Sequence, residues 1–170
     1  TDRRRLRHIR TEGGVSGEEG NATTRNGRMT ESKMTTATLG SILELQRGYD
    51  LPTSQMKPGN IPVAGSNGVI GYHDTSRADA PAITIGRSGS AGKVHYYDNP
   101  IWPHNTSLFV TDFKGNDPLY VYYLLSSLDF STYCGSSVVP SLNRNVIYPI
   151  LVDYHAEIDE QRRVVGVLSA

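Results

Sequence analysis

The 170-residue sequence contains a single cysteine, Cys134, and no hydrophobic run long enough to cross a bilayer. A lone cysteine excludes an internal disulfide framework and is typical of a reducing compartment, so we expect a cytoplasmic protein. A membrane span needs about 20 consecutive apolar residues, and we therefore expect no contact with a membrane. The arginines near the N-terminus are not followed by an apolar segment, so we expect no secretory signal there.

The sequence also lacks an excess of basic charge, because 17 Lys and Arg residues balance 17 Asp and Glu residues. Residues 1–34 carry eight basic and five acidic residues, whereas the remainder carries nine and twelve. A nucleic-acid-binding protein usually has a basic surface, so any such surface in this chain must be local. Hydrophobic residues make up 37% of the chain and charged residues 20%, as in ordinary globular domains.

Residues 1–34 are rich in Gly, Thr, Arg and Glu and contain few large apolar side chains. Such a segment buries too little surface to offset its conformational entropy. We therefore predict a flexible basic leader over residues 1–34. Organised sequence begins only after Met29 and Met34, which makes either one a candidate for the natural start.

The first organised segment predicts a helix. Thr38 is a suitable N-cap, and the apolar residues behind it recur at helical spacing, namely Leu39, Ile42 and Leu43. We expect this helix to end near Gly48, where glycine suits a left-handed C-cap.

Two hairpins are predicted next. The strand-like segments 61–64 and 69–72 flank a turn that contains Asn-Gly, which is the strongest short turn signal. Segments 82–85 and 93–97 flank a longer loop punctuated by glycines, and 108–110 resembles a further strand.

A second helix is predicted after Asp117, a good N-cap, with Pro118 at the first helical position. Its expected buried stripe consists of Leu119, Tyr122, Tyr123, Leu125 and Phe130. We then expect a strand over 146–152 and a final amphipathic helix within 155–170. Strands predominate without regular βαβ alternation, which indicates an α+β fold.

No pattern for catalysis, metal binding or cofactor binding is present. The glycine loop ends in Gly-Lys, as a P-loop does. A P-loop also needs glycine at position 87 and Ser or Thr at position 94, where this sequence has Arg87 and Val94. The histidines are scattered, and no nucleophile elbow occurs. We therefore expect no catalytic residue, no metal site and no cofactor in this chain.

Polar residues of the kind that contact DNA recur in several predicted loops. Arginine bonds guanine in a bidentate manner, asparagine bonds adenine likewise, and lysine and serine contact phosphates. The candidate DNA-binding residues are Arg47, Tyr49, Ser66, Asn67, Arg87, Ser88, Ser90, Lys93, Ser137, Asn143 and Arg144.

The order of these motifs resembles one target-recognition domain of a type I restriction–modification specificity subunit. The similarity covers residues 38–168 and rests on segments 38–48, 61–72, 85–94, the tyrosine- and leucine-rich helix after Pro118, 139–143 and 160–163. The resemblance implies a curved, mostly antiparallel sheet with flanking helices over residues 35–153. It also implies the start of a spacer helix over 154–170.

The resemblance implies a non-catalytic module that directs partner subunits to one half of a split target in double-stranded DNA. The partners would be a methyltransferase subunit and, through the complex, a motor-nuclease restriction subunit. Family members usually carry two recognition domains, whereas this chain has room for one, and 153–155 replaces the usual proline before the final helix. We therefore expect a half-length or truncated subunit.

The final helix is expected to contact a partner helix. Ile158, Val165 and Leu168 form one predicted apolar face, interrupted by Gln161. Because this face is short, we expect either a methyltransferase contact or a weak homodimer. The alternative function is a stand-alone binding domain for a small ligand or carbohydrate, or a hydrolase with an unrecognised site.

Overall fold

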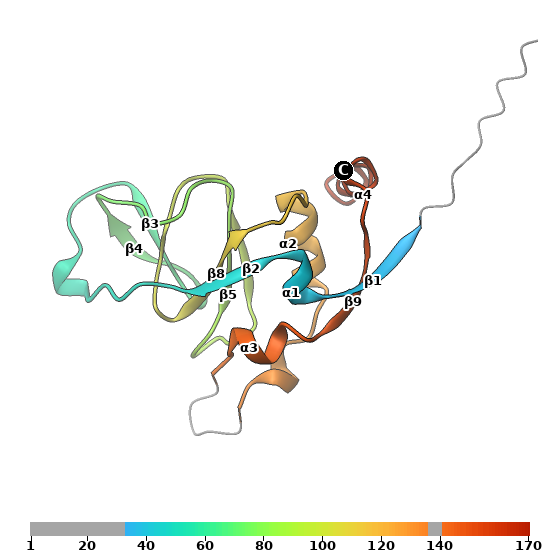
Figure 1. Cartoon of the computed structure of the whole chain (residues 1–170). Coiled ribbons are helices and arrows are strands. Elements are labelled where there is room, and N and C mark those ends of the chain that lie inside the picture. The colour runs from blue at the N-terminus through green and yellow to red at the C-terminus, as the bar shows by residue number, and fades with distance from the viewer. Residues whose placement is uncertain (1–32, 136–140) are drawn as a thin grey trace, which may run out of the picture. The chain divides into compact units, whose positions relative to one another are not determined.

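The structure, a computed structural model, describes residues 33–135 and 141–170, so the predicted leader lies outside it except for Lys33 and Met34. The strands are β1 (Met34–Thr38), β2 (Glu44–Arg47), β3 (Ile61–Gly65), β4 (Gly68–His73), β5 (Ala82–Gly86), β6 (Val94–Tyr97), β7 (Trp102–Pro103), β8 (Ser107–Asp112) and β9 (Leu151–His155). The helices are α1 (Leu39–Ile42), α2 (Pro118–Ser126), α3 (Arg144–Ile147) and α4 (Ile158–Leu168), with 3-10 turns at Thr53–Gln55 and Ser131–Tyr133. The fold is α+β, as predicted (Figure 1).

The strands form three small sheets in the described part of the chain, with orders β1-β9, β2-β8-β5-β6 and β4-β3-β7. Every pairing within them is antiparallel except that of β3 with β7. The mostly antiparallel arrangement is therefore confirmed. None of the described helices is long and apolar enough to cross a membrane.

Both predicted hairpins are confirmed. β3 and β4 pair around the two-residue turn Ser66-Asn67. Gly68 has a backbone φ of +108°, which residues other than glycine rarely adopt. β5 and β6 pair with Ala82 opposite Tyr97 and Ile85 opposite Val94. All residues of β5 are buried because β5 lies between β8 and β6 and is covered on both faces.

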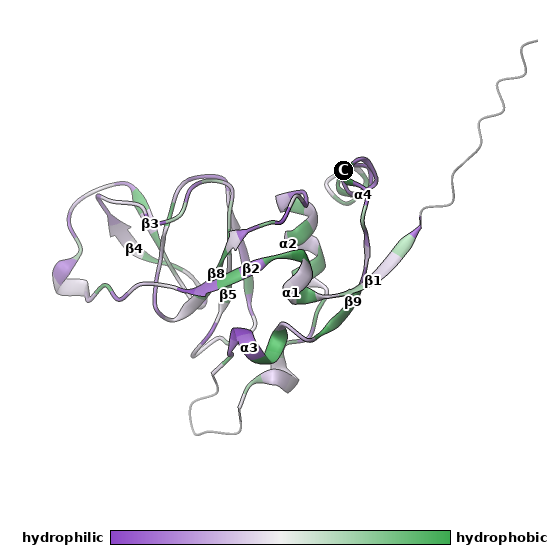
Figure 2. Ribbon diagram, in the orientation of Figure 1, coloured by the Kyte–Doolittle hydropathy of each residue, from purple (hydrophilic) through white to green (hydrophobic). Residues whose placement is uncertain are grey.

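The main core lies between the four-stranded sheet and helices α1, α2 and α3. Figure 2 shows the apolar stretches of β2, α1 and α2 gathered in this region. The buried residues of this core are Leu39, Leu43, Leu45, Ile83, Ile85, Leu108, Val110, Val121, Leu125, Phe130, Leu142 and Ile147. Each element supplies one or a few apolar side chains, so the sheet and helices are stabilised only together.

The predicted first helix is too long. α1 ends at Ile42, and the next residues form β2, which pairs with β8 and buries Leu45. Gly48 is not a left-handed cap. It is required because a Cβ there would lie 2.1 Å from the carbonyl oxygen of His104. Strand pairing with β8 therefore overrides the helical spacing of the local sequence.

The second helix begins as predicted but buries a different face. The Asp117 carboxylate accepts hydrogen bonds from the amides of Leu119 and Tyr120, and Pro118 occupies the first turn. The fully packed side chains are Tyr120, Val121 and Leu125. The predicted stripe is wrong at Leu119 and Tyr123, which are half-buried and do not belong to the main core, whereas Tyr122 is half-buried and packs against that core.

The predicted strand over 146–152 is wrong in its first half. Residues 144–147 form α3, whose N-terminus is capped when the Asn143 side chain accepts from the amide of Asn145. Strand β9 begins only at Leu151, and it pairs with β1. The carbonyls of Tyr148 and Ile150 accept from the amides at the start of α1, so this segment cannot join a sheet ladder.

Candidate functional site

The β3–β4 turn packs against the glycine-rich loop between β5 and β6. A Cβ on Gly86 would lie 2.7 Å from the carbonyl oxygen of Ser66, so glycine permits this close approach. The Lys93 ammonium donates to the Asn67 side-chain oxygen at 2.7 Å. Four of the predicted residues, Ser66, Asn67, Ser90 and Lys93, therefore belong to these two adjoining loops.

The glycine-rich loop also joins the late segment around 141–144. The carbonyl oxygen of Arg87 accepts from the Leu142 amide at 2.8 Å, and Ser88 forms an antiparallel bridge with Ser141. The Arg87 amide in turn donates to Thr106 at 2.8 Å. These backbone bonds place residues from two distant parts of the sequence next to each other.

Three predicted arginines line one pocket of about 280 Å³, which we name the three-arginine pocket. Its lining residues are Gln46, Arg47, Arg87, Leu108, Leu142, Asn143 and Arg144, none of which is acidic. Three guanidinium groups around one hollow create a local positive potential, although the chain as a whole has no net charge.

The three arginines differ in how far their donors are already used. Arg47 forms an exposed ion pair with Asp50 at 3.2 Å, and Arg144 donates to the Leu45 carbonyl at 2.8 Å. Within the described residues the Arg87 guanidinium makes no hydrogen bond and no ion pair. Arg87 is therefore the member of the pocket with the most freedom to bind an external ligand.

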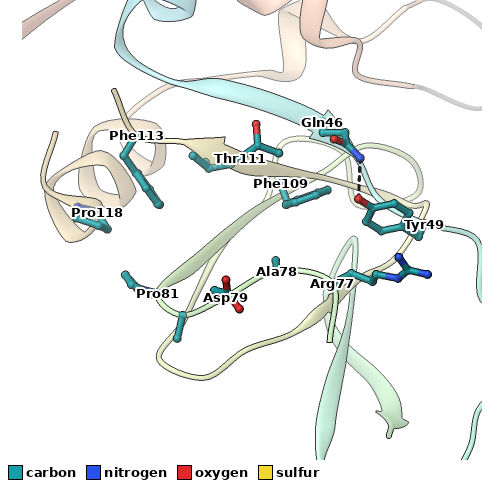
Figure 3. Close-up of a pocket in the computed structure, with 12 residues that line it drawn as sticks. Gln46, Tyr49, Arg77, Ala78, Asp79, Pro81, Phe109, Thr111, Phe113 and Pro118 are labelled. Carbon is teal, nitrogen blue, oxygen red and sulfur yellow. Dashed lines mark hydrogen bonds between the residues drawn. The ribbon is translucent and has the colours of Figure 1, made fainter. Parts of the chain in front are cut away.

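A larger pocket of about 450 Å³ adjoins the first through Gln46, and we name it the Arg77 pocket. Figure 3 shows Tyr49 and Arg77 at one end and Phe113 and Pro118 at the other. Its lining residues are Gln46, Tyr49, Arg77, Ala78, Asp79, Ala80, Pro81, Phe109, Val110, Thr111, Phe113 and Pro118. The predicted residue Tyr49 lies here, where its hydroxyl accepts a hydrogen bond from the side-chain Nε2 of Gln46 at 3.0 Å.

Sequence reasoning missed Arg77. Its guanidinium carbon lies 5.3 Å from the centre of the Tyr49 ring and 5.2 Å from that of the Trp102 ring, a cation–π arrangement on both. The three residues are far apart in the sequence, and Arg77 stands in a polar segment that resembles an ordinary loop. Only the tertiary structure brings the rings beneath the arginine.

Two titratable groups near the loops have shifted pKa values. A hydrogen bond from Asn105 and the charge of Arg47 lower the pKa of the exposed carboxyl of Asp50. Burial, reinforced by the nearby Lys93 ammonium, lowers the pKa of His95, while a hydrogen bond with the Ser66 backbone opposes the shift. His95 therefore favours its neutral form behind the β3–β4 turn.

The predicted helix residues do not form one exposed seam. Gln161 is fully buried, where it accepts from the Asp117 amide at 2.8 Å and donates to Asn116 and to the His155 carbonyl, each at 2.7 Å. Ile158 and Val165 are half-buried, whereas Leu168 is 55% exposed.

The exposed apolar part of α4 is centred on Val167 and Leu168, with exposures of 75% and 55%. These side chains line a groove with Val164, and Leu168 also lines a second groove together with Met34 and Tyr123. The predicted residue Ser137 lies outside the described part of the chain. In the described part, no three His, Cys, Asp or Glu side chains are grouped to hold a metal ion.

Comparison with solved structures shows where this fold occurs. The chain is similar to the S subunit of a type I restriction-modification system from M. genitalium, with a TM-score of 0.70, 17% identity, and coverage of 82% of this chain and 39% of that one. It is also similar to the HsdS subunit from Thermoanaerobacter tengcongensis, with a TM-score of 0.56, 13% identity, and coverage of 86% and 39%. A third match, to a type I R-M system structure on complex assembly and conformational transition, has a TM-score of 0.64, 11% identity, and coverage of 86% and 40%.

The chain spans about two fifths of the length of these chains. No curated protein sequence is significantly similar to it. Residues 31–153 match the family described as type I restriction modification DNA specificity domain. That range includes every residue that lines the three-arginine pocket. The chain belongs to this family of type I restriction–modification DNA specificity domains.

Proposed function

We propose that this chain recognises one half of a split target in double-stranded DNA through the three-arginine pocket and the two loops beside it. The observation that carries the proposal is that Arg47, Arg87, Asn143 and Arg144 line one pocket without an acidic neighbour in its wall. Lys93 and Asn67 lie on the adjoining loops. Guanidinium and amide groups are the ones that read base edges in the major groove.

The roles of these residues follow from how their donors are used. Arg87 has an uncommitted guanidinium and is the best candidate for bidentate contact with guanine or phosphate. Lys93 is exposed and provides a point charge for a phosphate. Arg144 already donates to the Leu45 carbonyl, and the Asn143 side chain already caps α3. Both residues therefore also position the wall of the pocket.

The proposed module is not an enzyme, and its output depends on partner subunits. We propose that it directs a methyltransferase subunit and, through the assembled complex, a motor-nuclease subunit to the bound DNA. Solved relatives include a type I R-M system described in terms of complex assembly. Methyl transfer from labelled S-adenosylmethionine by the purified chain alone would contradict the non-catalytic role.

The exposed apolar end of α4 is the proposed partner contact. Val167 and Leu168 form a small apolar surface next to Val164, where a helix of a methyltransferase subunit or of a second copy can pack. Because this surface is short, self-association is expected to be weak and to depend on concentration. Sedimentation at rising concentration, with and without the methyltransferase subunit, tests this, and Leu168→Asp should abolish any association.

DNA binding is tested in the complex with a cognate methyltransferase subunit. Its target is first selected from a duplex library, and affinity is then measured at several salt concentrations. We expect Arg87→Ala to weaken binding by about 1–3 kcal/mol if Arg87 reads a base. Lys93→Ala should reduce the slope of log affinity against log salt concentration by about 1. Arg162→Ala, at an exposed arginine of α4, is the matched control. Unchanged affinity and salt slope in both Arg87→Ala and Lys93→Ala would refute the proposed surface.

A further inference from the structure

The Arg77 pocket is not used by the proposed DNA contacts, although it is larger than the three-arginine pocket. Its volume of about 450 Å³ lies within the range of about 300–1,000 Å³ that is typical of small-ligand sites. The wall combines aromatic rings with a few polar groups, as such sites usually do. The chemistry of these groups indicates which ligand fits.

Arg77 is held in place without spending its hydrogen-bond donors. The rings of Tyr49 and Trp102 contact the guanidinium by cation–π interaction, with Arg77 Cζ 5.3 and 5.2 Å from the ring centres. Within the described residues the Arg77 side chain makes no hydrogen bond or ion pair. Its N–H groups are therefore pre-positioned to bind an oxyanion such as a phosphate.

Asp79 requires hydrogen-bond donors from the ligand, whereas Arg77 requires acceptors. Figure 3 shows Asp79 and Pro81 across the pocket from Phe109 and Thr111. An ionised carboxylate only accepts hydrogen bonds, so it selects a ligand with N–H donors at that end and repels a second phosphate. Pro81 and the small accessible part of Phe109 supply apolar wall of the same pocket, against which a planar group can lie.

We propose that the Arg77 pocket binds a nucleotide whose base carries an exocyclic amino group. The phosphate contacts Arg77, the base lies against Phe109, and the amino group donates to Asp79. The nucleotide is either free in solution or an unstacked residue of bound DNA, and only the second source rests on the proposed DNA-binding function.

The free nucleotide is tested by titrating the full chain with deoxyadenosine monophosphate. Trp102 is the only tryptophan of the sequence, and it lies beneath Arg77, so its fluorescence reports on this pocket. We expect a saturable signal. Deoxyadenosine, which lacks the phosphate, and purine deoxyriboside monophosphate, whose base has no N–H donor, should bind at least about 10-fold more weakly.

Two variants assign the two ends of the ligand. Arg77→Gln should weaken binding of deoxyadenosine monophosphate by at least about 10-fold. Asp79→Ala, which removes the acceptor, should abolish the preference over purine deoxyriboside monophosphate. Both positions are exposed, and circular dichroism and thermal midpoints verify that the variants fold. Arg162→Ala should bind like the unaltered chain, and an equal loss in Arg162→Ala and Arg77→Gln would overturn the assignment.

The DNA source is tested with duplexes that carry 2-aminopurine, whose fluorescence rises when the base leaves the stack. A rise that Arg77→Gln abolishes identifies a nucleotide of bound DNA as the ligand. Binding of deoxyadenosine monophosphate without such a rise identifies a free nucleotide. If millimolar nucleotide gives no signal and the duplexes give no rise, the proposal is wrong. Failure of DNA recognition is separate, because it is measured by the effect of Arg87→Ala on duplex affinity.

Discussion

The guanidinium of Arg144 donates to the carbonyl oxygen of Leu45 at 2.8 Å, joining residues that are 99 positions apart. The pairing of β2 with β8 is irregular at this point, between Glu44 and Leu45. The Tyr148 hydroxyl accepts from the Leu45 amide at 2.8 Å and donates to its carbonyl at 3.1 Å. Side chains of the late segment thus satisfy the main chain of β2 beside the three-arginine pocket.

Arg144→Ala should therefore lower the free energy of unfolding by about 1 kcal/mol, because the Leu45 carbonyl loses a charged donor. Arg87→Ala should leave stability within about 0.5 kcal/mol, because the Arg87 side chain has no partner in the described residues. Urea denaturation of both variants measures the difference. Equal stabilities would mean that the bond to Leu45 contributes nothing.

Gln161→Leu should destabilise the chain by about 2–4 kcal/mol. The substitution removes the side-chain oxygen of Gln161 that accepts from the main-chain amide of Asp117. It also removes the side-chain NH2 group that donates to the His155 carbonyl. Thermal or urea denaturation measures the loss. Arg162→Ala, at the next position and exposed, is the control and should change stability by less than about 0.5 kcal/mol. A stable Gln161→Leu variant would show that the predicted apolar face tolerates a continuous stripe.

Two glycine substitutions should have opposite effects. Gly48→Ala places a Cβ 2.1 Å from the His104 carbonyl oxygen and should cost about 3 kcal/mol, since backbone must move. Gly166→Ala introduces a Cβ with no atom within 4 Å in the interior of α4, and should stabilise by about 0.5–1 kcal/mol through helix propensity. Denaturation midpoints test both. A tolerated Gly48→Ala would refute the close approach of Gly48 to the 103–104 segment.

Stability should fall as the pH drops below about 6.5. Burial lowers the pKa of His95 in the folded chain, so the folded state binds fewer protons than the unfolded state. The contribution of neutral His95 is complete above the unfolded pKa of about 6.5 and is lost as the pH falls towards the folded pKa. Thermal midpoints between pH 8 and pH 5 should therefore decline more steeply for the unaltered chain than for His95→Gln. Parallel curves would remove His95 as the cause.

Predictions from the sequence succeeded where the signal was local. The Asp117 cap acts on amides two and three positions ahead, and the Asn-Gly turn joins strands that follow one another directly. They failed where contacts between distant segments competed with the local pattern. Helical spacing after Thr38 gave way to the pairing of β2 with β8, and Gln161 proved central to the packing of α4.

By itself, the sequence determined the α+β class, both hairpins and the residue types available for DNA contact, because turns, caps and alternation act over a few positions. Only the tertiary structure decided that Arg47, Arg87 and Arg144 line one pocket and that Arg77 stacks on Tyr49 and Trp102. The physical reason is that charge clusters and ring contacts depend on distances in space, which the order of residues along the chain does not fix.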